Sequence, residues 1–208
     1  MRNELMDFVR TRKKANLLIV CLNIVVFLYL SIFVGNTTDA VMMEAHGAMF
    51  VPDVLERGEY YRLLTSMFLH FGIEHLAFNM LLLIFAGDML TIQVGTVRYL
   101  CIYLGGGLAG NLLSLAVNAK ADSYAVSAGA SGAIFAVIGA LVFLVIINRG
   151  RIKGLNGRGI CAMAVLSLLQ GFTDSGVDNY AHLGGFIGGF LLAGVFQMWS
   201  YLRNCRKV

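Results

Sequence analysis

Four polar side chains stand near the starts of apolar stretches, and their chemical types suit a nucleophilic site. Ser131 lies in the sequence Gly-Ala-Ser-Gly, His182 lies in Ala-His-Leu-Gly, and Asn79 follows His75 by four residues. A serine hydroxyl is a weak nucleophile until a base takes its proton, and histidine is the usual base. An amide and a second imidazole are donors of the kind that stabilise an oxyanion. These residue types predict acyl transfer, with Ser131 as nucleophile and His182 as base.

Each of these residues also has a plainer interpretation. A lone serine among small residues is more often a helix-packing residue, and a lone histidine in an apolar stretch is more often a satisfied polar contact. His75 and Asn79 share one face of a predicted helix, so both side chains can serve one site. With the backbone N–H of Ser131, they are the candidate oxyanion-stabilising donors.

A third member of a catalytic triad is not evident. Asp88 lies toward the far end of the stretch that His75 opens, and Asp174 and Asp178 fall in a predicted loop. A Ser–His dyad is therefore the more economical hypothesis. Because the two histidines are interpreted as a base and a donor, we expect no metal and no other cofactor.

The composition identifies the solvent of this protein. Of the 208 residues, 58% are apolar and only 13% are charged, and the mean hydropathy is +0.76. A soluble domain is nearer half apolar and a quarter charged. The core of a domain of this size cannot bury all of these additional apolar residues, because a small domain keeps much of its surface in contact with solvent. The chain is therefore predicted to be an all-α membrane protein, which excludes soluble enzymes and nucleic-acid-binding modules.

Six apolar stretches are candidate membrane spans. They run from Asn16 to Val34, His75 to Val94, Tyr99 to Val117, Ser131 to Ile147, Gly159 to Phe172 and Ala181 to Tyr201. The second contains Asp88, and the fifth is short of the usual length of about 20 residues. The prediction is a single membrane domain over residues 1–208, with a basic arm at 1–15 and a long external loop at 35–74.

The distribution of basic residues supports six spans with both termini in the cytoplasm. In that topology only Arg57, Arg62 and Lys120, of 16 lysines and arginines, lie outside. Basic residues in short loops stay in the cytoplasm. The second, fourth and sixth spans then all begin at the external leaflet, so His75, Asn79, Ser131 and His182 are predicted to lie at one depth.

Glycine-rich packing is the device expected to join the two dyad residues. The sixth stretch carries Gly184, Gly185, Gly188 and Gly189, which form overlapping pairs of small residues four apart. Such pairs let helix backbones approach closely. Packing against Gly132, Ala136 and Gly139 of the fourth stretch would bring His182 to Ser131. His46 and His70 are assigned structural roles or none.

The order of the motifs resembles that of the rhomboid intramembrane serine proteases. The matching blocks are Gly58-Glu59-Tyr60-Tyr61-Arg62, Leu69-His70-Phe71-Gly72, His75-Leu76-Ala77-Phe78-Asn79-Met80, Gly129-Ala130-Ser131-Gly132 and Ala181-His182-Leu183-Gly184-Gly185-Phe186-Ile187-Gly188-Gly189. A single block is weak, but together, in this order, they are highly specific.

The resemblance implies a six-transmembrane-helix bundle of the minimal bacterial type and hydrolysis of peptide bonds in or near transmembrane segments. It implies Ser131 and His182 as catalytic residues and His75 and Asn79 as oxyanion-side residues. Phe135 matches an aromatic position that packs against the catalytic histidine, where many relatives have tyrosine. Tyr61 departs from the commoner tryptophan.

Two other function classes fit the sequence less well. A non-catalytic rhomboid-like factor that binds membrane proteins would keep the bundle and lose the dyad, and both dyad residues are present here. A transporter would be expected to show charged residues in mid-span or inverted repeats, and neither is evident in the sequence. The expected partners of a protease are transmembrane protein substrates and the bilayer, without nucleic acid. A short basic arm without a transit peptide favours a bacterial plasma membrane.

Hydrolysis below the membrane surface also needs a path for water. Polar residues within a membrane are tolerated where they line a water-filled cavity. We expect a cavity open to the outside, bounded by the second, fourth, fifth and sixth spans. The short fifth span and the loop 171–176, which contains two glycines, are its predicted movable cover.

Overall fold

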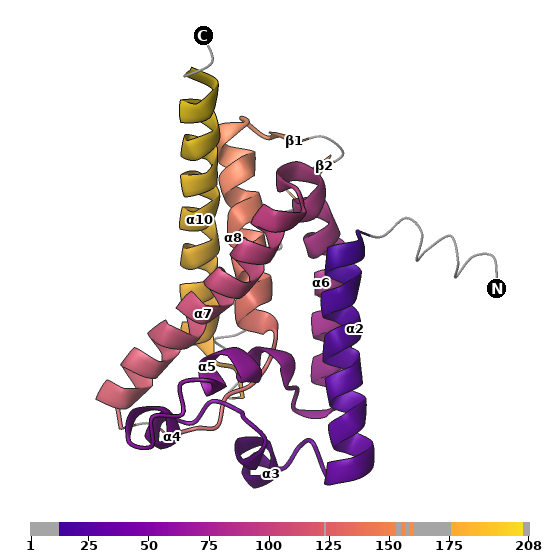
Figure 1. Cartoon of the computed structure of the whole chain (residues 1–208), viewed down its shortest axis with the longest axis vertical. Coiled ribbons are helices and arrows are strands. Elements are labelled where there is room, and N and C mark those ends of the chain that lie inside the picture. The colour runs from indigo at the N-terminus through magenta and orange to yellow at the C-terminus, as the bar shows by residue number, and fades with distance from the viewer. Residues whose placement is uncertain (1–12, 123, 153–154, 157–158, 160–175, 206–208) are drawn as a thin grey trace, which may run out of the picture. The chain divides into compact units, whose positions relative to one another are not determined.

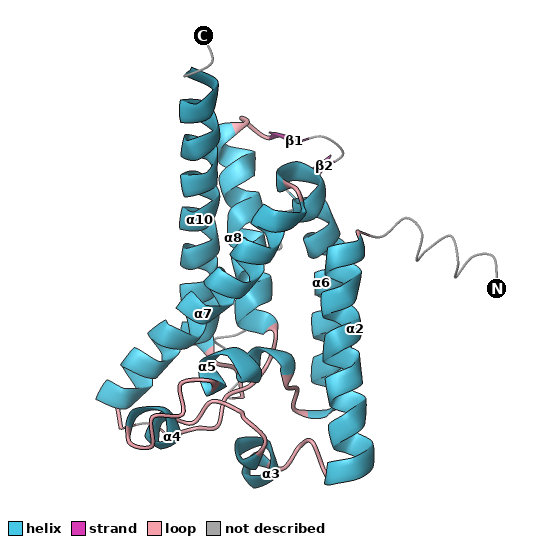
Figure 2. Ribbon diagram, in the orientation of Figure 1, coloured by secondary structure: helices cyan, strands magenta, loops and turns pink. Residues whose placement is uncertain are grey.

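The computed structural model describes residues 13–122, 124–152, 155–156, 159 and 176–205. These residues belong to two compact units. The first unit comprises residues 1–100 and 124–130, and the second comprises 101–123 and 131–208. Helices dominate the described part of both units (Figure 2).

Five of the six predicted spans are helices of the structure. They are α2 (Lys14–Tyr29, continued by the π-helical turn η1 Leu30–Val34), α6 (Gly72–Val94), α7 (Thr96–Lys120), α8 (Ser131–Ile147) and α10 (Asn179–Cys205). Among the described residues, four segments are long and apolar enough to cross a membrane: Lys14–Val34, Gly72–Val94, Thr96–Lys120 and Asn179–Arg203. The apolar helix α8 is shorter, with 17 residues. The fifth predicted span, apart from Gly159, and loop residues 171–175 lie outside the described residues, and with them the predicted movable cover.

The observed helices extend beyond the apolar stretches because backbone geometry and capping residues, rather than hydropathy, set where a helix ends. Only Gly95 separates α6 from α7, and its φ of +82° lies in the left-handed region that favours glycine. At its other end, α6 begins three residues before His75.

Helices α2 and α6 of the first unit lie side by side (Figure 1) and share a buried polar cluster. The Asn16 amide donates to the Asp88 carboxylate at 2.9 Å and to the Leu83 carbonyl at 3.0 Å. The Tyr99 hydroxyl donates to Asn16 Oδ1 at 2.6 Å. Asn16 fits there because Gly87 has no side chain. Asp88, the charge that weakened this span in the sequence, is therefore paired within the protein.

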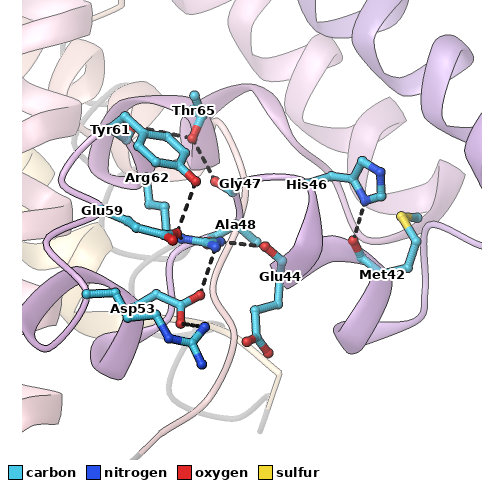
Figure 3. Close-up of polar contacts among 11 residues, drawn as sticks. Met42, Glu44, His46, Gly47, Ala48, Asp53, Glu59, Tyr61, Arg62 and Thr65 are labelled. Atoms are coloured by element: carbon cyan, nitrogen blue, oxygen red, sulfur yellow. Dashed lines mark hydrogen bonds and ion pairs between the residues drawn. The ribbon is translucent and has the colours of Figure 1, made fainter.

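The long loop, predicted at 35–74, ends at residue 71, before α6 begins, and it contains short helices: α3 (Ala40–Ala45), α4 (Val51–Leu55), α5 (Arg62–Thr65) and the 3₁₀ turn η2 (Ser66–Phe68). Arg62, only 5% exposed, holds them together (Figure 3). Its guanidinium contacts the Asp53 carboxylate at 2.8 Å and donates to Glu59 at 2.6 Å. It also donates to the carbonyls of Glu44 and Ala48. The Arg62 guanidinium thus binds carboxylates and carbonyls from several segments of the loop. The loop is therefore an ordered element.

The segment that leads to Ser131 packs against this loop within the first unit. Met49 and Ser127 form a two-way backbone bridge, each N–H donating to the other's carbonyl at 2.8 Å. Val126 and Ala128 pack on a core cluster made by Leu30, Met43, Ala48 and Leu69. The loop therefore holds the chain just before the candidate nucleophile.

The second unit is organised by the pair α8 and α10, which lie side by side (Figure 1). Beyond α8, two short antiparallel strands, β1 (Arg151–Ile152) and β2 (Leu155–Asn156), pair Arg151 with Asn156. These strands are too short to alter the fold class, which is all-α as predicted.

Candidate active site

Ser131 and His182 meet within the second unit. Ser131 is the first residue of α8, and His182 is the fourth residue of α10. The distance from Ser131 Oγ to His182 Nε2 is 2.8 Å, which is a good hydrogen bond. With Nε2 as the acceptor, the serine donates its proton toward the imidazole. The pair has the geometry that a serine nucleophile and its base require.

Close backbone contact between α8 and α10 accounts for this meeting. A Cβ at Gly185 would collide with the backbone carbonyl of Gly132, and one at Gly189 would collide with Ala136. From the other side, Gly139 lies directly against the backbone of Phe186. The prediction that these small residues allow tight packing is confirmed. They let α10 approach α8 closely enough for the short Ser131 side chain to reach an imidazole.

An aromatic ring fixes the plane of the imidazole. Phe135, one turn after Ser131 on α8, stacks on His182 with ring centroids 4.2 Å apart and an interplanar angle of 23°. The packing predicted for this position is confirmed. His182 is only 8% exposed, so its orientation is set by protein contacts.

A hydrogen-bonded cap at the start of α10 was missed by sequence reasoning. Asp178, assigned to a loop, is the residue directly before α10, and its carboxylate accepts from the Ala181 N–H at 2.9 Å. The same carboxylate accepts from the Ser114 hydroxyl of α7 at 2.6 Å. The available signal was an aspartate immediately before an apolar helix, which is a favoured N-cap.

His75 and Asn79 lie on α6 of the first unit. Asn79 is 2% exposed, and its side-chain nitrogen has no hydrogen-bond partner within the described ranges. A buried amide donor without a partner is costly and calls for an explanation. His75 is half-buried, and its ring meets the His70 ring edge-on, with centroids 5.2 Å apart.

His70 holds the backbone that precedes the candidate nucleophile. Its Nε2 accepts from the N–H of Ala130 at 3.4 Å, and Gly129 N–H donates to the Ser66 carbonyl at 2.9 Å. Burial and, to a smaller extent, the neighbouring His75 lower the pKa of His70 to about 3, against a raising effect of the Phe68 backbone. The neutral ring is the form that can accept at Nε2. His70 therefore has a structural role.

His46 lies apart from this arrangement. It is exposed, and its Nδ1 donates to the Met42 carbonyl at 2.8 Å (Figure 3). Met42 lies in the short helix α3, and His46 is the C-cap residue of the same helix, so the bond is local. His46 is therefore a local structural residue, and it is a useful control.

A family model described as the Rhomboid domain matches residues 57–199, a range that contains all four candidate site residues. The chain belongs to the rhomboid family. The resemblance drawn from the motifs is therefore confirmed. As a rhomboid with several apolar helices, it is an integral, multi-pass membrane protein.

Similar curated proteins come from bacteria and plants. Rhomboid protease GluP of Bacillus subtilis (strain 168) is 39% identical over 176 residues, covering 85% of this chain and 33% of GluP. RHOMBOID-like protein 1 of Arabidopsis thaliana is 37% identical over 161 residues, covering 76% of this chain and 40% of that protein. YdcA of Bacillus subtilis (strain 168) is 35% identical over 136 residues, 65% of this rhomboid and 67% of YdcA. This rhomboid thus aligns with about a third of GluP.

Proposed function

We propose that this rhomboid is an intramembrane serine endopeptidase that hydrolyses peptide bonds in or near transmembrane segments of membrane proteins. The observation that carries the proposal is the 2.8 Å hydrogen bond between Ser131 Oγ and His182 Nε2, formed between two apolar helices. A serine and a histidine that served only helix packing would not need to be hydrogen-bonded to each other. GluP, which is 39% identical, is named as a rhomboid protease.

The reaction follows from the pair. His182 Nε2 takes the proton of Ser131 Oγ as that oxygen bonds to the scissile carbonyl carbon. The tetrahedral intermediate collapses, the C–N bond breaks, and the leaving amine takes the proton from His182. Water then gives a proton to His182 and attacks the acyl-serine. That proton returns to Ser131 Oγ as the ester bond breaks and the carboxylic product leaves.

Developing negative charge on the carbonyl oxygen needs donors. The Ser131 N–H is one of the first N–H groups of α8, which have no partner inside their own helix. The buried Asn79 amide has an unused donor within the described ranges. His75 contacts His70, which binds Ala130, the neighbour of Ser131 in the chain. These observations support Asn79, His75 and the Ser131 N–H as the oxyanion donors.

The substrates proposed are transmembrane proteins presented by the bilayer. An extended segment must reach Ser131, so helix-breaking residues near the cut favour cleavage. Glycine lowers the cost of leaving a helix by about 1 kcal/mol and proline by about 3 kcal/mol, relative to alanine. The asymmetry of basic residues supports cytoplasmic termini. The proposed location is a bacterial plasma membrane.

The test is cleavage of a transmembrane model substrate, together with labelling by a fluorophosphonate probe that reacts with activated serines. Ser131→Ala and His182→Ala are each expected to abolish both signals, to the same extent as the double variant, because the two residues act as a unit. EDTA is expected to leave the wild-type rate unchanged.

Two control variants match these changes. Ser200→Ala removes a hydroxyl on α10 that donates to the Phe196 carbonyl, and His46→Ala removes an exposed imidazole. Both are expected to keep activity. Cleavage by Ser131→Ala at the wild-type rate would refute the proposal. A well-folded wild-type protein that binds the substrate without cleaving it would instead favour the non-catalytic factor.

A further inference from the structure

The N-terminal turn of α10 carries the proposed base, and Asp178 accepts two of the hydrogen bonds at its start. The Asp178 carbonyl accepts from the His182 N–H at 3.1 Å, which is the first regular bond of the helix. The Asp178 carboxylate accepts from the Ala181 N–H at 2.9 Å. The first N–H groups of a helix lack partners in their own helix, so this cap decides where the helix begins. The conformation of Asp178 is thereby transmitted to the backbone of His182.

The cap is tied in turn to a second helix of the same unit. Ser114 of α7 is fully buried, and its hydroxyl donates to the Asp178 carboxylate at 2.6 Å. The Asn118 amide donates to Ser114 Oγ at 3.0 Å. Since a hydroxyl has one proton, the chain of bonds runs in one direction, from Asn118 through Ser114 to Asp178. A short bond from a hydroxyl to a carboxylate is among the stronger kinds.

Backbone packing holds the same turn at the same place. A Cβ at Gly110 of α7 would collide with the Ala181 carbonyl, and one at Gly184 would lie 3.0 Å from the Ala109 carbonyl. The α7 segment of the second unit therefore contacts α10 on both sides of His182 in sequence. His182 is the fourth residue of α10, so unwinding of this first turn would remove the helical backbone that directs its ring toward Ser131.

We propose that Asp178 and Ser114 are positioning residues for the general base, which they hold toward Ser131 through the N-terminal turn of α10. The inference rests on the proposed function. Neither residue touches substrate in this scheme. Asp178 caps the helix that carries His182, and Ser114 orients the carboxylate of the cap.

The experiment measures kcat and KM for a transmembrane substrate with Asp178→Ala, Asp178→Asn, Ser114→Ala and the Ser114/Asp178 double alanine variant. Asp178→Ala is expected to lower kcat about 10- to 100-fold with KM within about twofold, because small misplacements of a catalytic group cost about this much. Asp178→Asn keeps an acceptor for the Ala181 N–H and is expected to recover most of kcat, since asparagine caps as well as aspartate. The double variant should be no slower than Asp178→Ala, because both residues act through one cap.

The matched control is Asp39→Ala. Asp39 is the N-cap of α3 in the first unit and accepts from the Val41 N–H at 2.8 Å. Its removal takes away an aspartate cap from a helix without a candidate catalytic residue. The thermal midpoint is expected to fall, with kcat unchanged.

Three outcomes would overturn the inference: wild-type kcat in Asp178→Ala, equal losses in Asp178→Asn and Asp178→Ala, or a loss confined to KM. If Asp178→Ala does not fold, Ser114→Ala decides, with Ser200→Ala as its control. A lower kcat at constant KM supports the inference, and an unchanged kcat overturns it. Failure of the proposed function is separate, because it would appear as cleavage by Ser131→Ala.

Discussion

Adding one methyl group at Gly185 tests whether close approach of α8 and α10 sets the dyad. Gly185 lies three residues after His182 on α10. Its substitution by alanine would place a Cβ 2.9 Å from the carbonyl carbon of Gly132 and closer still to the carbonyl oxygen. The obstacle is backbone, which cannot rotate away as a side chain does. Gly185→Ala must therefore move the helices apart near Ser131.

The size of the shift follows from contact distances. Carbon atoms in contact lie about 3.5–4.0 Å apart, so relief of the 2.9 Å approach to the carbonyl carbon alone requires a separation of at least roughly 0.6–1.1 Å. Added to the 2.8 Å bond between Ser131 and His182, this exceeds the usual hydrogen-bond range of about 2.7–3.2 Å. A misplacement of about 1 Å costs about 100-fold in rate. We expect kcat of Gly185→Ala to fall by about that factor.

The assay is cleavage of a transmembrane substrate, with fluorophosphonate labelling as a second readout and the thermal midpoint as a check on folding. Gly194→Ala is the matched control on the same helix, because its Cβ would meet only the Phe143 ring, at 3.4 Å. It is expected to keep activity and to gain up to about 1 kcal/mol of helix stability. Wild-type kcat in folded Gly185→Ala would refute the packing argument.

Three further predictions concern the oxyanion donors, pH and topology. Asn79→Ala should retain measurable activity, reduced roughly 100- to 1000-fold, because one donor of three is lost; activity as low as in Ser131→Ala would contradict a donor role. The pKa of His70 is lowered to about 3, so the unfolded state binds the extra proton between pH 6.5 and 3. Stability is then full above pH 6.5 and falls toward pH 3 by about 1.4 kcal/mol per unit. Thermal midpoints of His70→Gln should depend less on pH, and equal slopes would refute this. In intact cells, a membrane-impermeant thiol reagent should label a cysteine placed at Lys120 and miss Cys205, whereas labelling of native Cys205 would reverse the topology.

Much of the fold is determined by local sequence. The four long spans and α8 were predictable because burial in lipid depends on the apolar content of each stretch, without reference to a partner. Ser131 begins α8 at the residue predicted. The glycines of α10 also indicated a packing face, since close helix approach requires small residues at regular spacing.

The remaining features depend on contacts between residues far apart in the chain. Ser131 and His182 are 51 residues apart, and their 2.8 Å bond depends on how α8 and α10 pack. The cap that Asp178 makes to Ala181 had a local signal, but its bond to Ser114, 64 residues away on α7, depends on tertiary packing. Arg62 likewise donates to the carbonyls of Glu44 and Ala48, which lie in a segment without a recognisable sequence pattern. Hydropathy measures the free energy of transferring one stretch of chain into lipid, and it needs no partner. A hydrogen bond depends on the distance and the angle between two groups. Those quantities exist only once the helices have packed.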